Sequence, residues 1–165
     1  PGASGVVVSP PPLVPQRAEQ WRARGGSPKN RRPPRHSGRR SAPTRQARGH
    51  NPQCGDDLQV ELVMAGHTVQ DIGFHGQGCA ICIASVSMMS EAVIGRDTAE
   101  VQALQQRFRA VLTGQLEPGE ADLGKLVSLA GVRRYPSRIK CALLGGQARM
   151  HALAADAGGT PGARA

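Results

Sequence analysis

The stretch that decides the fold runs from Gly76 to Glu91 and reads Gly-Gln-Gly-Cys-Ala-Ile-Cys-Ile-Ala-Ser-Val-Ser-Met-Met-Ser-Glu. Its glycine-rich beginning predicts a turn, and the apolar spacing after it predicts a helix whose first turn carries Cys79 and Cys82. Unpaired backbone N–H groups and the helix macrodipole favour the thiolate form of a cysteine at the start of a helix. Sulfur chemistry is therefore expected at this position.

A period-two pattern comes directly before this stretch. It predicts a β-hairpin over residues 58–75, in which Gly66 supplies the turn. Antiparallel pairing would place Cys54 and Asp56, at the start of the hairpin, beside Cys79, just past its end. The alternating apolar residues of the first strand are Leu58, Val60, Leu62 and Met64. The hairpin therefore predicts a shared site at one end of a small sheet.

Helical periodicity continues beyond the decisive stretch. Asp97 with Glu100 resembles a capping box, and Pro136 is expected at the first position of a last helix that carries Cys141. The adjacent Gly145-Gly146 is expected to bend that helix or to end it early. The predicted helices span residues 80–94, 98–112, 121–130 and 137–153. The fold class expected is α+β, with a small antiparallel sheet packed against a layer of three to four helices.

Residues 1–49 have a different composition from the rest of the chain. They contain nine prolines, and residues 1–50 hold 11 basic residues and one acidic residue, against ten and eleven in residues 51–165. Such a segment buries too little apolar surface to offset its ordering entropy. We therefore predict a disordered basic arm over residues 1–49, a domain over 50–153 and a disordered tail over 154–165, with no third strand from residues 44–50.

The basic arm has three interpretations. It is a solvated tail, a segment that contacts nucleic acid or an acidic partner, or an organelle transit peptide whose amphipathic helix the prolines would interrupt. No aromatic stacking platform accompanies the charge, which argues against nucleic acid as a partner. No apolar run is long enough for a transmembrane helix, so no membrane partner is expected, and a cytoplasmic protein is predicted. Without a visible signal peptide, metal or catalytic use of the four cysteines is favoured over disulfides.

The chemistry-bearing residues form one constellation. Cys54, Asp56, Cys79 and Cys141 offer three thiolates and a carboxylate, a donor set that Zn(II) accepts. Their spacing matches no compact zinc finger, so ordinary buried thiols with a turn aspartate remain an alternative. The pair Cys79 and Cys82 also has the spacing of a thioredoxin-type redox motif, but no βαβ units surround it. Cys82 is interpreted as a small apolar residue beside the site, or as a secondary sulfur acceptor.

Four ordered motifs carry a resemblance to a known family. They are Asn51-Pro52-Gln53-Cys54-Gly55-Asp56, Gly76-Gln77-Gly78-Cys79-Ala80-Ile81, Ala84-Ser85-Val86-Ser87-Met88-Met89-Ser90-Glu91-Ala92 and Arg138-Ile139-Lys140-Cys141-Ala142. Together they resemble the SufU-type branch of the U-type iron-sulfur cluster assembly proteins, within the NifU N-terminal and IscU-like superfamily, over residues 51–153. The insertion-like segment 122–132 and Lys140, where scaffold proteins carry a histidine, favour the SufU branch.

The resemblance implies roles for individual residues. Cys54, Asp56, Cys79 and Cys141 correspond to the family's zinc ligands, and Cys54 to its sulfur acceptor. Arg138 corresponds to an arginine beside the site and is expected to act in catalysis or docking, with a solvated charge as the alternative. The implied cofactor is Zn(II), alternatively iron or a transient 2Fe-2S cluster. The implied partners are a SufS-type cysteine desulfurase and the downstream iron-sulfur assembly machinery.

Three functions follow from these observations. The leading one is a zinc-dependent sulfurtransferase that accepts persulfide sulfur on Cys54. The second is a non-enzymatic scaffold that assembles a 2Fe-2S cluster on the same cysteines. The third is a structural zinc domain with a nucleic-acid-binding arm.

Overall fold

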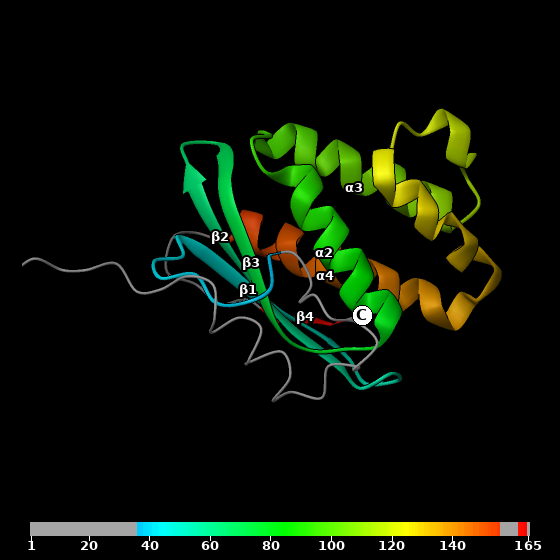
Figure 1. The fold of residues 1–165 in the computed structure, drawn as a ribbon, viewed down its shortest axis with the longest axis horizontal. Coiled ribbons are helices and arrows are strands. Elements are labelled where there is room, and N and C mark those ends of the chain that lie inside the picture. Colours follow the sequence, from blue (N-terminus) through cyan, green and yellow to red (C-terminus); the bar gives the residue numbers. More distant parts are fainter. Residues whose placement is uncertain (1–35, 156–161, 165) are drawn as a thin grey trace, which may run out of the picture. The chain divides into compact units, whose positions relative to one another are not determined.

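The structure, a computed structural model, describes residues 36–155 and 162–164 and contains one mixed sheet (Figure 1). The sheet order is β3-β2-β1-β4. Three strands are antiparallel, whereas the short β4 runs parallel to β1. The strands are β1 (Arg45–Asn51), β2 (Asp56–Ala65), β3 (Thr68–Gln77) and β4 (Gly162–Arg164).

Helices cover one side of this sheet. The last helix packs on β1 and β2, and α2 packs against it, so the core lies between these two helices and the strands. Helix α3 contacts the 3-10 segment η2 and α4 (Figure 1). The elements are α2 (Ala80–Val93), α3 (Thr98–Leu112), η1 (Pro118–Glu120), η2 (Gly124–Arg134) and α4 (Pro136–Ala154). The expected α+β class, a small antiparallel sheet against a layer of helices, is confirmed.

The predicted hairpin is formed by β2 and β3. Gly66 turns the chain in the left-handed region at φ +60°, and Asp57 pairs with Gln77 at the far end. Three of the four predicted inward residues, Leu58, Val60 and Leu62, are fully buried. Met64 is only partly buried, because a register shift between Val63 and Met64 interrupts the alternation.

The expectation that residues 44–50 form no strand is wrong. Strand β1 pairs antiparallel with β2, and its inward residues are Ala47, Gly49 and Asn51. A Cβ on Gly49 would lie 3.1 Å from the Leu144 side chain, so small residues here let α4 approach the sheet closely. A strand buried through small side chains lacks the apolar alternation that marks the hairpin.

The segment just before β1 is hydrogen-bonded to the hairpin and begins at the free edge of β3. The Phe74 amide donates to the His36 carbonyl at 3.1 Å, and the Gly38 amide donates to the Phe74 carbonyl at 2.7 Å. The Arg40 amide donates to a carboxylate oxygen of the buried Glu61 at 2.6 Å. The predicted boundary at residue 50 therefore lies too late. The rest of the predicted arm, residues 1–35, is outside the described residues.

The C-terminal part also differs from the predicted tail. Helix α4 continues to Ala154, and Gly162–Arg164 pairs with β1 as strand β4, so this piece is not the unstructured chain that was expected. Residues 156–161 and 165 are outside the described residues.

The helix signals are mostly confirmed. Asp97 caps α3 in a capping box with Glu100, and α2 ends before Gly95, which has φ +80°. The predicted α-helix over residues 121–130 is wrong, because the chain forms the 3-10 segment η2 there. Asp122 and Gly124 both have positive φ, which no α-helix accommodates.

The adjacent Gly145 and Gly146 do not end α4, which continues to Ala154. A Cβ on Gly145 would lie 2.6 Å from the Cβ of Val86 on α2, and one on Gly146 would lie 2.2 Å from the Gln105 side chain on α3. The two glycines therefore serve as the contact surface of α4 with both neighbouring helices.

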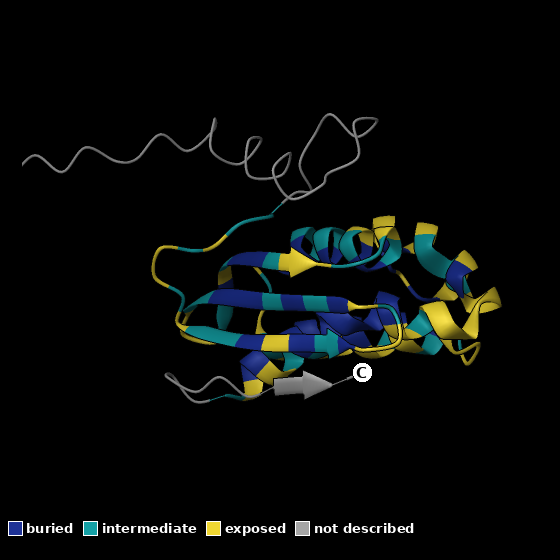
Figure 2. Cartoon of the chain, turned by 90° about the horizontal axis from the view of Figure 1, so that it is seen from below, coloured by how far each residue is buried: buried dark blue, intermediate teal, exposed yellow. Residues whose placement is uncertain are grey.

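Figure 2 shows buried residues along the strands and on the helix sides that face them. No helix in the described part of the chain is long and apolar enough to span a bilayer.

Candidate metal centre

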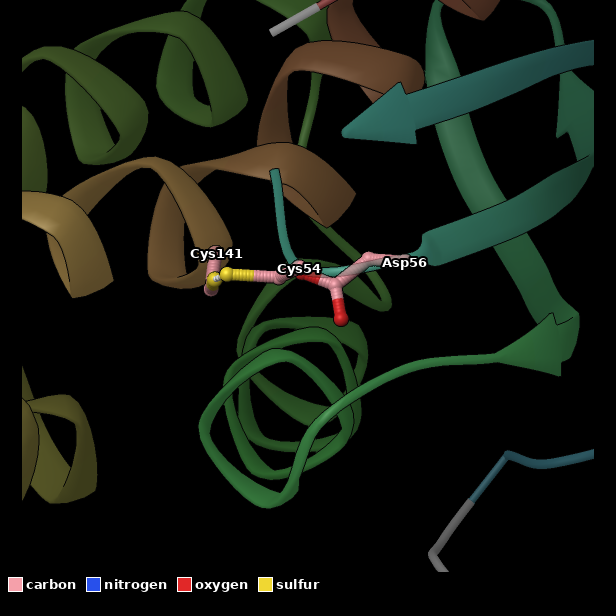
Figure 3. A group of neighbouring side chains, drawn as sticks. All are labelled: Cys54, Asp56 and Cys141. Carbon is pink, nitrogen blue, oxygen red and sulfur yellow. Dashed lines mark hydrogen bonds between the residues drawn. The ribbon is translucent and has the colours of Figure 1, made fainter. Parts of the chain in front are cut away.

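Three separate segments bring the candidate ligands to one end of the sheet. Cys54 lies in the loop between β1 and β2, Asp56 is the first residue of β2, and Cys141 lies near the start of α4. One ligand atom from each lies within 4.8 Å of the others (Figure 3). Three of the four residues predicted as ligands are therefore clustered, although 85 residues separate Asp56 from Cys141 in the sequence.

The loop that carries Cys54 is a tight turn. Gly55 has φ +68°, a conformation that favours glycine, and this lets Cys54 and Asp56 face the same side. The Sγ of Cys54 lies 3.0 Å from the Sγ of Cys141 (Figure 3). Asp56 and Cys141 are buried, whereas Cys54 is partly exposed. Cys54 is thus the member of this group that a reactant from solution reaches.

The Asp56 carboxylate points toward the beginning of α2 (Figure 3). Its Oδ1 accepts a hydrogen bond of 2.7 Å from the backbone amide of Cys79. Its buried Oδ2 has no hydrogen-bond partner among the described residues. A buried carboxylate oxygen without a donor is unfavourable unless a cation binds it. Two thiols and this oxygen form a donor set that fits a divalent metal ion.

Cys79, the fourth predicted ligand, lies outside the group of three. It is the N-cap of α2, and its Sγ accepts a hydrogen bond from the Cys82 amide at 3.4 Å. Its own amide donates to Asp56, so the helix start and the site are directly connected. Burial raises the pKa of the Cys82 thiol, as expected for a small apolar residue beside the site.

Burial and neighbouring side chains shift the pKa values of two groups at the site. Burial raises the pKa of Cys141, and its hydrogen bond with Cys54 raises it further. The Nη1 of Arg138 lies 3.8 Å from the Cys54 Sγ, and its hydrogen bond to Cys141 and the charge of Cys54 raise the pKa of Arg138. Arg138 is therefore a cation positioned against the accessible thiol.

Comparison with known proteins places this geometry in a family. The family described as the NifU-like N terminal domain matches residues 30–142. The chain belongs to this family. Its match begins in the predicted arm and ends just past Cys141, so it includes all four predicted ligands.

Two curated relatives are similar to most of the domain. The chain is 36% identical over 110 residues to the zinc-dependent sulfurtransferase SufU of Bacillus subtilis, which covers 67% of this chain and 75% of the relative. It is 40% identical over 104 residues to the iron-sulfur cluster assembly scaffold protein IscU of Streptococcus pyogenes, with 63% and 65% covered. The chain therefore spans about two thirds of the length of this second relative.

Solved structures support the same assignment. A putative iron-sulfur cluster assembly scaffold protein for the SUF system from Fervidobacterium islandicum matches with a TM-score of 0.68 and 29% identity, covering 72% of this chain and 86% of that one. A NifU-like protein, N-terminal part, from Brucella abortus matches with a TM-score of 0.65 and 26% identity, covering 72% and 83%. The resemblance found in the four motifs is thus confirmed.

Asn51 is a site residue that the sequence reasoning did not single out. Its Nδ2 donates to the Cys141 Sγ at 3.5 Å, and its Oδ1 accepts from the Gln53 amide at 3.2 Å. Its carbonyl accepts from the Cys54 amide at 3.3 Å. Asn51 is buried and so holds both the loop of Cys54 and the sulfur of Cys141. The signal was an asparagine directly before a proline, which is typical of a turn stabilised by the side chain.

We expect Asn51→Ala to weaken metal binding by about tenfold, the lower end of what loss of a hydrogen bond to a metal ligand costs. The measurement is competition for zinc with a chromophoric chelator. Gln53→Ala is the matched control, because Gln53 is exposed and takes part through its backbone. Equal affinities of Asn51→Ala and Gln53→Ala would show that Asn51 does not support the site.

Proposed function

We propose that this protein is a zinc-dependent sulfurtransferase of iron-sulfur cluster assembly, and that Cys54 accepts persulfide sulfur from a cysteine desulfurase. One observation carries the proposal. Cys54 is partly exposed and faces Arg138, whereas the thiol and the carboxylate beside it, those of Cys141 and Asp56, are buried. A donor protein can therefore reach one sulfur of the group. The proposed partners are a SufS-type desulfurase and the downstream assembly machinery, in the cytoplasm.

The residues that would hold zinc are Cys54, Asp56 and Cys141, with Cys79 at the start of α2 as the fourth ligand. A bound Zn(II) supplies positive charge that keeps the thiols deprotonated at neutral pH. The similarity to a relative named as a zinc-dependent sulfurtransferase supports this choice of metal. The buried Oδ2 of Asp56, which has no hydrogen-bond partner among the described residues, independently supports a bound cation at this site.

The transfer step needs a nucleophile and a stabilised anion. The Cys54 thiolate attacks the outer sulfur of the donor's persulfide, a new S–S bond forms, and the donor's S–S bond breaks. The donor cysteine leaves as a thiolate and Cys54 becomes the persulfide, so no external oxidant or reductant is consumed. The guanidinium of Arg138, at 3.8 Å from the Cys54 Sγ, stabilises the anionic sulfur before and after transfer.

A second candidate function is a scaffold on which a 2Fe-2S cluster is assembled. Relatives from Streptococcus pyogenes and Fervidobacterium islandicum are named as iron-sulfur cluster assembly scaffold proteins. Thiolates that bind zinc also bind iron, so the donor set itself fits both functions.

Asp56→Ala separates the two functions. If the site is a zinc-thiol site, we expect the purified variant to be colourless and to hold less zinc than the wild type, because one ligand is lost. Asp57→Ala is the matched control, since Asp57 is the next residue but pairs with Arg48 outside the site. A brown Asp56→Ala protein that contains iron and sulfide would instead support the scaffold. Metal analysis and the visible spectrum are the measurements.

A further inference from the structure

The segment from Arg133 to Lys140, which joins η2 to α4 (Figure 1), is the feature on which we build. Seven of its eight residues are exposed, Ile139 being the exception. It contains four of the ten basic residues found beyond residue 50 and no acidic residue. Because residues 51–165 carry eleven acidic residues in total, this is a local concentration of positive charge within a nearly neutral region. We name residues 133–140 the basic turn.

Most of this charge is not neutralised by the described residues. Arg133 lies 3.4 Å from a carboxylate oxygen of the exposed Glu117, a weak surface pair. Arg134 and Lys140 form no ion pair with any described residue. Arg138 faces the sulfur of Cys54. The basic turn therefore presents a positive surface to an incoming molecule, and that surface borders the accessible thiol.

The basic turn also contains an aromatic residue, Tyr135, whose sequence neighbours include Arg134 and Arg138. Tyr135 is 62% exposed, more than the other large apolar side chains that are exposed in the described residues, Ile94 and Val127. Its hydroxyl makes no hydrogen bond to a described residue. Tyrosine and arginine are enriched among residues that dominate binding energy at protein interfaces. An exposed tyrosine between arginines is therefore typical of a docking surface.

We propose that the basic turn is the docking surface for the sulfur donor, a protein whose surface beside its persulfide cysteine is acidic and has an apolar pocket for Tyr135. The inference rests on the proposed function and adds the partner's surface chemistry to it. The contact of Arg138 with Cys54 places the docking surface and the acceptor sulfur side by side. A nucleic acid would also be attracted by this charge, but the turn carries one aromatic residue and no second stacking platform.

The test uses the full chain and a SufS-type cysteine desulfurase, with affinity measured by surface plasmon resonance at several salt concentrations. Reversing two charges in the double variant R134E/K140E is expected to raise the Kd about tenfold and to reduce its salt dependence, because charges at the rim of an interface steer association. Tyr135→Ala is expected to raise the Kd to a similar extent, and Tyr135→Phe much less. Raising the concentration of R134E/K140E should restore sulfur transfer.

Arg96→Glu is the matched control for charge. Arg96 lies at the opposite end of the hairpin, where its carbonyl accepts from the Val69 amide, and it forms no ion pair with a described residue. The Kd of Arg96→Glu should stay within about twofold of the wild type, since a charge far from the interface contributes little at physiological salt. Circular dichroism and zinc content of each variant show whether the fold is intact.

The outcomes separate the docking proposal from the proposed function. If R134E/K140E binds the desulfurase as tightly as Arg96→Glu does, the docking proposal is wrong even when sulfur transfer proceeds. If the wild type binds through the turn but Cys54 receives no sulfur, docking stands and the transfer function fails. A single-stranded RNA that displaces the desulfurase, and that loses affinity in the same variants, would assign the turn to nucleic acid and overturn the proposal.

Discussion

Replacing Cys54 with serine is expected to abolish acceptance of sulfur from the desulfurase, by at least about a thousandfold in rate, as removal of a nucleophile does in other enzymes. A serine hydroxyl is protonated at neutral pH and does not attack a persulfide. The measurement is intact-mass analysis of the chain after reaction with the desulfurase and cysteine, where acceptance appears as one added sulfur atom. The fold should persist, because Cys54 lies in a partly exposed loop.

Cys82→Ser is the matched control for this experiment. Cys82 is buried three residues beyond Cys79 and is outside the clustered group. We expect the control to gain sulfur like the wild type. If Cys54→Ser still gains a sulfur atom and Cys82→Ser does not, then Cys82 is the acceptor. Unfolding of Cys54→Ser would instead support a purely structural zinc site.

Gly145→Ala is expected to destabilise the fold by about 1 kcal/mol net, because overpacking a core typically costs about 2 kcal/mol. The added Cβ would lie 2.6 Å from the Cβ of Val86 and 3.2 Å from its Cα, so α2 and α4 must separate. This outweighs the gain of about 1 kcal/mol in helix propensity of alanine over glycine. Because α2 begins at Cys79 and α4 carries Cys141, zinc affinity should fall together with stability.

Denaturant unfolding of the metal-free protein measures the stability change. Gly119→Ala is the matched control, because no atom lies within 4 Å of a Cβ at that position. If Gly145→Ala is as stable as Gly119→Ala, then the two helices adjust without cost, and the account of the glycine contact is wrong.

Elements with strong local signals were predictable from the sequence. The alternation of Leu58, Val60 and Leu62 with polar residues indicates a strand with one buried face. The capping box of Asp97 and Glu100 indicates the start of α3. These signals depend on neighbouring residues alone. The hairpin also placed Cys54 and Asp56 beside the start of α2, which the hydrogen bond between Asp56 and Cys79 confirms.

Features that depend on tertiary contacts were not predictable. Strand β1 is buried through Ala47 and Gly49, and its small residues have meaning only once α4 lies on them. The same holds for Gly145, which weakens an isolated helix but allows close packing of two. Propensity describes a segment alone, and in both places the packing partner is distant in the sequence.

The residue types of the site were predictable, but the difference in exposure among its thiols was not. The motifs indicated four ligands, and the structure clusters Cys54, Asp56 and Cys141 while Cys79 caps α2 beside them. Which sulfur is accessible depends on burial by α4 and the strands, which no motif encodes. The support that Asn51 gives to the site likewise depends on a contact with Cys141, 90 residues away.

The most direct test of the central claim is metal analysis, with a visible spectrum, of the wild type purified without added metal. About one zinc per chain and no visible absorbance is the result expected for a site with three thiolates and one carboxylate that protects an acceptor thiol. Iron and sulfide with charge-transfer bands in the visible range would contradict the zinc-thiol account and identify the centre as a cluster scaffold.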